Sequence, residues 1–148
     1  NEVTLRITAK TEDEISANAL LNQTEAEIMA KVGEFFYGYG EENSLFEVVV
    51  NLLKEKQLSI TAAESLTAGE FQATLGTIPG VSEVFPGGFA GPDELEGKPK
   101  GTVYIALAQK DGETLISENH FTRDRSYVRH SSVMKGLDMV RRAILNKS

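Results

Sequence analysis

The sequence contains no cysteine. This excludes a disulfide framework and thiol chemistry, and it suits a reducing compartment, so we expect a cytoplasmic location. The sequence also lacks any apolar run of membrane-spanning length, and no signal peptide is visible. We therefore predict no membrane insertion.

Basic residues are scarce: 15 Lys and Arg stand against 22 Asp and Glu, which gives a net charge of −7. Nucleic-acid binding needs a basic face, so the charge argues against it and we expect no direct nucleic-acid partner. The charge is uneven, however, because basic residues outnumber acidic ones from Phe121 onward. A solvated helix face is the simpler interpretation. The alternative is that Arg123, Arg125 or Arg129 holds a ligand phosphate, since the guanidinium fork fits phosphate oxygens.

Residues 1–39 have the pattern of a small α+β domain. Val3, Leu5 and Ile7 alternate with polar residues, which predicts a half-buried strand. A capping box at residues 11–14 predicts the start of a helix, and a second helical run ends at Gly33. Residues 35–37 are typical of a short strand. The polar, glycine-containing residues 38–43 predict a linker, which gives domains 1–39 and 40–148.

The second domain begins with a capping box at residues 44–47, and the following helix is predicted to bury Val48, Val49, Leu52 and Leu53. A helix of this kind packs on a sheet, which predicts α/β layering. Near the C-terminus, residues 103–107 and 115–121 are predicted to form a hairpin around Asp111-Gly112. Asp124 is predicted to cap the last helix. Its buried side is predicted to carry Val133, Leu137, Val140 and Ile144.

Residues 58–71 read as a strand, a tight corner and a helix that we expect to begin at Leu66. Ser65 and Thr67 lie at the corner, where free helix N–H groups and the helix dipole favour an anion or a developing oxyanion. A hydroxyl in that field can act as a nucleophile if a base lies nearby. The alternative is that the hydroxyl only caps the helix.

Residues 63–69, Ala-Glu-Ser-Leu-Thr-Ala-Gly, resemble the Ala-Glu-Ser-Cys-Thr-Gly-Gly signature of the CinA C-terminal family. Four later stretches resemble further family motifs in the same order: residues 78–85, residues 87–89, residues 90–104 (Ala-Gly-Pro-Asp with Lys-Pro-Lys-Gly-Thr-Val-Tyr), and residues 121–129. Residues 1–39 are similar to the KH-like middle domain of CinA proteins. They lack the Gly-x-x-Gly loop of nucleic-acid-binding KH domains, which favours a spacer or dimerising module. The resemblance implies a three-layer α/β/α C-terminal domain after a small α+β KH-like domain.

The resemblance also implies a reaction: hydrolysis of the carboxamide of nicotinamide mononucleotide, with Ser65 as nucleophile and neither metal nor cofactor. The family's activating Lys and assisting Tyr have no counterpart here. Lys98 and Lys100 are the nearest loop candidates, and both are typical of solvated residues. His120 and His130 have no partner motif and are predicted to be structural or exposed. The expected ligand-binding residues are Thr67, Gly69, Gly87, Gly88, Phe89, Gly91, Pro92, Asp93, Arg125 and Arg129.

Three features depart from the family pattern. Leu66 replaces Cys, and Ala68 replaces Gly, which adds a methyl group that could narrow the pocket. Several dozen family residues separate Gly-Gly-Phe from Ala-Gly-Pro-Asp, whereas Phe89 and Ala90 abut here. We predict that residues between Phe89 and Ala90 belong to the intact polypeptide. The alternative is a genuine deletion, which would remove catalysis. The first residue is not Met, so we also expect an upstream part.

A second function follows from these departures. Family members are tied to bacterial competence and DNA-damage responses, so a catalytically degenerate domain could bind a protein partner such as a recombinase. A third is a dimerisation region for an upstream nucleotide-processing domain. In each case we expect a homodimer or higher homo-oligomer.

Overall fold

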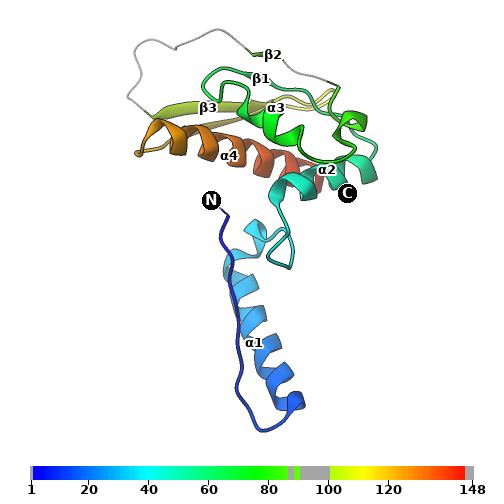
Figure 1. Cartoon of the computed structure of the whole chain (residues 1–148), viewed down its shortest axis with the longest axis vertical. Coiled ribbons are helices and arrows are strands. Elements are labelled where there is room, and N and C mark those ends of the chain that lie inside the picture. The colour runs from blue at the N-terminus through cyan, green and yellow to red at the C-terminus, as the bar shows by residue number, and fades with distance from the viewer. Residues whose placement is uncertain (1, 87–88, 91–100, 146–148) are drawn as a thin grey trace. The chain divides into compact units, whose positions relative to one another are not determined.

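The computed structural model describes residues 2–86, 89–90 and 101–145. The chain divides into two units, one of residues 2–43 and the other from Ser44 on (Figure 1). The first unit has an extended segment, then α1 (Glu14–Val32) and a 3-10 turn, η1 (Gly33–Phe35). Asp13 caps α1, because its carboxylate accepts a hydrogen bond from the Ser16 N–H at 2.8 Å.

Several predictions for the first unit are wrong. One continuous helix replaces the two predicted, because no Gly or Pro interrupts residues 14–32. Residues 3–8 form no strand, since no described segment of the chain pairs with them and a strand needs a neighbour. The strand predicted at residues 35–37 is also absent from the described structure, because η1 extends to Phe35.

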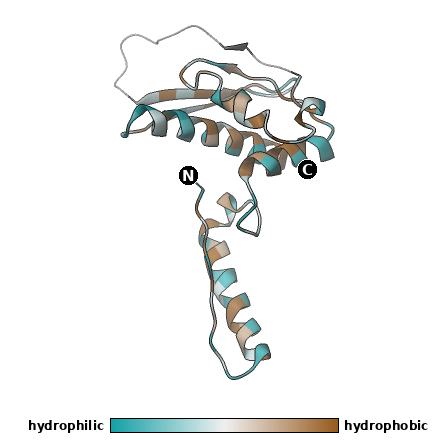
Figure 2. Ribbon diagram, viewed as in Figure 1, coloured by the Kyte–Doolittle hydropathy of each residue, from teal (hydrophilic) through white to brown (hydrophobic). Residues whose placement is uncertain are grey.

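The first unit has little core of its own. None of the 19 residues of α1 is buried, and hydrophobic residues occur along its length (Figure 2). Val3 is 81% exposed, Ile15 is 84% exposed and Tyr39 is 74% exposed. Such apolar exposure is typical of a surface that another element covers.

The second unit opens with α2 (Leu45–Glu55), whose cap is Ser44 as predicted: its hydroxyl accepts a hydrogen bond from the Glu47 N–H at 3.2 Å. Val49 and Leu53 are buried as predicted, whereas Val48 and Leu52 are only half-buried. Further along the chain come α3 (Glu70–Leu75) and the 3-10 turn η2 (Val81–Glu83).

The described part of this unit contains two pairs of strands. β1 (Ala63–Glu64) runs parallel to β2 (Phe89–Ala90), with Ala63 opposite Phe89. β3 (Thr102–Leu107) runs antiparallel to β4 (Leu115–His120), with Leu107 opposite Leu115, which confirms the predicted hairpin. The predicted strand at residues 58–63 is mostly extended chain, which the hydrogen bond from the Ile60 N–H to the Val84 carbonyl holds in place at 2.8 Å.

Helix α4 (Arg125–Leu145) packs against β3, α2 and α3 (Figure 1). Asp124 caps it as predicted, accepting a hydrogen bond from the Tyr127 N–H at 3.0 Å. The predicted buried side is confirmed, and Leu137 is fully buried. Because helices and strands pack against one another in this unit, the predicted α/β class is confirmed. Within the described residues, no helix is long and apolar enough to cross a membrane.

Candidate functional site

The corner between β1 and α3 is a tight turn, not the start of a helix. The Ala68 N–H donates to the Ser65 carbonyl at 2.9 Å, and the Glu70 N–H donates to the Thr67 carbonyl at 3.0 Å. Ala68 and Gly69 have φ values of 51° and 84°. Two consecutive left-handed residues cannot belong to a right-handed helix, so the predicted start at Leu66 is wrong and α3 begins at Glu70.

Ala68 acts on the backbone of this corner. A left-handed conformation costs an L-amino acid about 1–2 kcal/mol that glycine does not incur. The Ala68 side chain is exposed and is not among the residues that line the cavity described below. Its physical effect in the structure is therefore backbone strain at the place where the family signature has glycine.

Glu64 occupies the N-terminus of α3. Its carboxylate oxygens accept hydrogen bonds from the Phe71 N–H and the Gln72 N–H, each at 3.0 Å, and the residue is only 5% exposed. Burial raises the pKa of the Glu64 carboxyl. The hydrogen bonds from the Thr67 hydroxyl and from Gln72 and Phe71 outweigh burial, and the pKa lies below its ordinary value of 4.5.

Glu64 is a residue that our sequence reasoning missed. The helix N–H groups expected to receive a ligand anion are bonded to this carboxylate instead. Glu64 lies six residues before the first residue of α3, so no local sequence signal marks it as the residue that caps this helix.

Arg129 on α4 holds the other side of the corner. Its Nε and Nη2 donate to the Thr67 carbonyl at 3.2 and 3.0 Å, and Nε lies 3.3 Å from Oε2 of Glu70. Nδ1 of His130 lies 3.6 Å from Oε1 of the same Glu70. Thr67 and Glu70 therefore attach the corner and the start of α3 to α4.

A cavity of about 1450 Å³ lies beside the corner. Its walls include residues 60–67, β3 and the apolar side of α4, and Ser65, Thr67, Tyr104, Arg123 and Arg125 are among its polar lining residues. The structure thus places Ser65, Thr67 and Arg125 in the lining of one cavity, together with Tyr104. Arg129 is not among the described lining residues.

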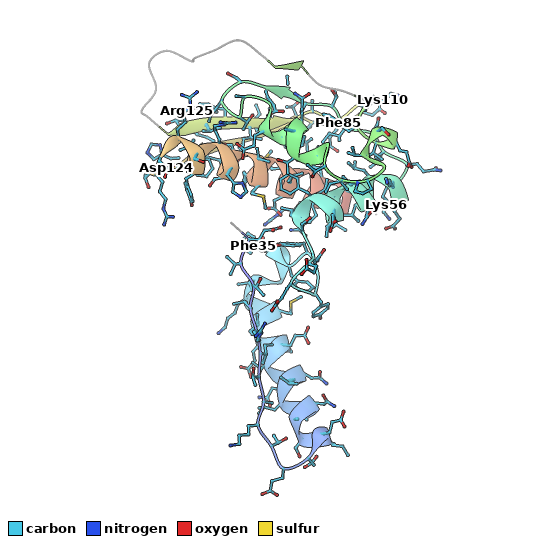
Figure 3. The ribbon with its side chains drawn as sticks, viewed as in Figure 1. Phe35, Lys56, Phe85, Lys110, Asp124 and Arg125 are labelled. Atoms are coloured by element: carbon cyan, nitrogen blue, oxygen red, sulfur yellow. The ribbon has the colours of Figure 1, made fainter. Side chains whose placement is uncertain are left out.

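The two lining arginines differ in their surroundings. The guanidinium carbon of Arg123 lies 4.7 Å from the centre of the Tyr127 ring, a cation–π contact. Arg125 is exposed and begins α4 beside Asp124, at the N-terminal end of that helix (Figure 3). Both arginines are thus exposed in the cavity lining, and Arg123 is the one in contact with an aromatic ring.

The other predicted site residues are placed less informatively. Gly87, Gly88, Gly91, Pro92 and Asp93 lie outside the described residues, as do Lys98 and Lys100. The backbone of Phe89 pairs with Ala63, and Gly69 caps α3 without lining the described cavity. Nδ1 of His120 lies 3.3 Å from the Thr102 hydroxyl oxygen. Among the residues described, no group of three metal-ligating side chains comes together.

The family comparison decides what this domain is. The CinA C-terminal domain model matches residues 42–89 and 86–144, and the model of the KH domain of damage-inducible protein CinA matches residues 1–38. The chain belongs to the CinA family. A competence-damage inducible protein of Levilactobacillus brevis is 41% identical over 196 residues, covering 97% of this chain and 47% of its own length. One of Streptococcus pneumoniae is 36% identical, covering 98% and 49%.

This CinA chain thus spans about half the length of the relatives it matches. A crystal structure of a CinA superfamily protein from Escherichia coli matches it with a TM-score of 0.59 at 17% identity, covering 74% of this chain and 97% of that one. At that identity the likeness concerns the fold alone.

The comparisons also bear on the Phe89–Ala90 junction. The C-terminal match falls in two stretches that meet at residues 86–89. The alignment with the L. brevis relative runs over 196 positions, whereas the chain has 148 residues, so several dozen positions have no counterpart here. Phe89 and Ala90 are consecutive within β2. The interruption between family motifs therefore falls beside the corner that carries Ser65.

Proposed function

We propose that this chain binds nicotinamide mononucleotide in the cavity and that Ser65 attacks its carboxamide carbon. The observation that carries the proposal is the position of Ser65. It follows β1 directly, and it lines a cavity of about 1450 Å³ together with Arg125. Ligand pockets commonly measure about 300–1,000 Å³, so a mononucleotide has ample room.

The reaction is an acyl transfer to water. The Ser65 oxygen bonds to the carboxamide carbon, the carbon–nitrogen bond breaks, and ammonia leaves after taking up a proton. Water then hydrolyses the ester on Ser65 and gives nicotinate mononucleotide. The hydroxyl needs a proton acceptor for its attack. Arg125 would bind the phosphate, because a guanidinium pairs well with phosphate oxygens.

One observation favours a second function. The described part of the cavity lining contains neither Lys nor His, the side chains that most often take a proton from serine. A domain that keeps the pocket but lacks the base would bind the mononucleotide without turnover. In that case the chain acts as a binding module, with a recombinase-type protein among its expected partners. A homo-oligomer and a cytoplasmic location stay predictions under either function.

Calorimetric titration with nicotinamide mononucleotide, run beside an ammonia assay, separates the two functions. Binding with ammonia release supports the hydrolase, and binding without release supports the binding module. The same assays on a chain with the matching residues of the L. brevis relative inserted between Phe89 and Ala90 test the junction. Turnover only after the insertion would mean that the side chain that accepts the serine proton belongs to the inserted residues. Absence of binding in both chains contradicts the proposal.

A further inference from the structure

We propose that Arg129 is a positioning residue: it fixes the corner that carries Ser65 by holding Thr67 and Glu70, and it does not contact the ligand. The effect on turnover rests on the proposed function, whereas the effect on the corner does not. The sequence offers a ligand-binding role for this arginine as an alternative to a solvated helix face, and its surroundings in the structure point elsewhere.

Among the described residues, the hydrogen bonds and the ion pair of Arg129 join it to Thr67 and Glu70. Two guanidinium nitrogens converge on one acceptor, the Thr67 carbonyl, at 3.0 and 3.2 Å, and the Glu70 carboxylate lies 3.3 Å from Nε. Thr67 and Glu70 lie on either side of the two left-handed residues of the turn. The guanidinium therefore bridges a part of the backbone that contains a left-handed alanine, a conformation that L-amino acids rarely adopt.

Arg129 connects this turn to the core. It lies between Val128 and Val133, which are 6% and 2% exposed on the buried side of α4. Thr67 is 62 residues away in sequence, so the contact joins a local turn to the main core helix. On the other side of Ser65, the side chain of Glu64 is hydrogen-bonded to the backbone of α3. Ser65 thus lies between two attached points, Glu64 and Thr67, while its own side chain belongs to the cavity lining.

Arg125 offers a matched comparison. It lies one helical turn before Arg129 on α4, and it lines the cavity that Arg129 does not line within the described residues. If Arg125 meets the ligand and Arg129 holds the corner, their substitutions should change different quantities. Lysine can replace only part of the Arg129 contact, because an ammonium lacks the planar fork of the guanidinium.

The test uses the full chain with Arg129→Ala, Arg129→Lys and Arg125→Ala. Amide hydrogen exchange of Ala68 and Glu70, measured by NMR, reports the turn, and amides near Leu137 report global stability. Calorimetry with nicotinamide mononucleotide reports binding. For Arg129→Ala we expect turn exchange to rise about tenfold or more, with Leu137 protection retained and the dissociation constant changed less than about threefold. For Arg129→Lys, turn exchange should lie between the rates of the original chain and of Arg129→Ala. Arg125→Ala should weaken binding of the mononucleotide without changing turn exchange.

Two outcomes overturn the proposal. Turn exchange unchanged in Arg129→Ala would mean that the contact does not hold the corner. Binding weakened about tenfold in both Arg129→Ala and Arg129→Lys, with exchange unchanged, would mean that Arg129 contacts the ligand. If the chain does not bind the mononucleotide at all, the proposed function fails, and the exchange measurement still decides whether Arg129 fixes the corner. In an active chain, Arg129→Ala should lower kcat and leave KM nearly unchanged.

Discussion

Replacing Glu64 with glutamine tests how the corner is built. The carboxylate accepts two backbone N–H bonds at 3.0 Å in a nearly buried site, and the Thr67 hydroxyl also donates to it. A hydrogen bond to a charged group contributes about 1.5–3 kcal/mol, and a buried donor left without a partner costs about 1–3 kcal/mol. Glutamine keeps one acceptor oxygen and turns an N–H₂ toward the other donor. We expect Glu64→Gln to lower the free energy of unfolding by about 2–4 kcal/mol at pH 7.

The pH dependence of this loss follows from the lowered pKa of Glu64. A folded-state pKa below the unfolded one means that the ionised carboxylate stabilises the fold. That contribution is complete above the ordinary value of 4.5, and it disappears as the pH falls through the folded-state pKa. The difference in stability between the original chain and Glu64→Gln should therefore shrink as the pH falls below about 4.5.

Urea unfolding followed by circular dichroism, at pH values from 7 down to 3, measures both effects. Glu83→Gln is the control, because the Glu83 carboxylate is 70% exposed and lies 3.9 Å from the Lys54 ammonium. We expect the control to change stability by less than about 0.5 kcal/mol. A Glu64→Gln chain as stable as the original at pH 7 would refute the reasoning, as would a loss that is the same at every pH.

Three further predictions concern strain, capping and assembly. In thermal unfolding, Ala68→Gly should raise the free energy of unfolding by about 1 kcal/mol, because glycine adopts the left-handed conformation without strain. The control Ala73→Gly, within α3, should lower it by about 0.5–1 kcal/mol. A lower stability of Ala68→Gly would contradict the inferred backbone strain at Ala68. Asp124→Ala should cost about 1 kcal/mol in the same assay through loss of the α4 cap, and an unchanged melting temperature would argue against the cap. If the exposed apolar surface of the first unit forms a homodimer, analytical sedimentation should give twice the monomer mass for the original chain. Ile15→Asp should then sediment as a monomer. If the original chain is a monomer at all concentrations, the dimer prediction is wrong.

The features predicted correctly are those that nearby residues determine. Ser44 and Asp124 cap their helices through side chains that reach three residues along the chain, so the sequence alone sufficed. The hairpin and the buried side of α4 follow from periodicity in the same way.

The errors lie where distant partners or unusual dihedral angles decide. The left-handed conformation of Ala68 prevents the helix that we expected to begin at Leu66, and an alanine in the sequence does not indicate that conformation. The alternation of Val3 and Leu5 predicted a strand, but pairing depends on a neighbour that the pattern does not specify. Arg129 donates to a carbonyl 62 residues away, and nothing in the neighbouring sequence indicates that contact.

The account depends most on Ser65 as the residue that reacts with the pyridine carboxamide. Proton NMR of nicotinamide mononucleotide, incubated with the chain, follows its conversion to nicotinate mononucleotide directly. Ser82, an exposed serine outside the described cavity lining, provides the control. We predict conversion by the original chain and by Ser82→Ala, and none by Ser65→Ala. Equal conversion by Ser65→Ala, or no conversion by any of the three chains, would contradict the account.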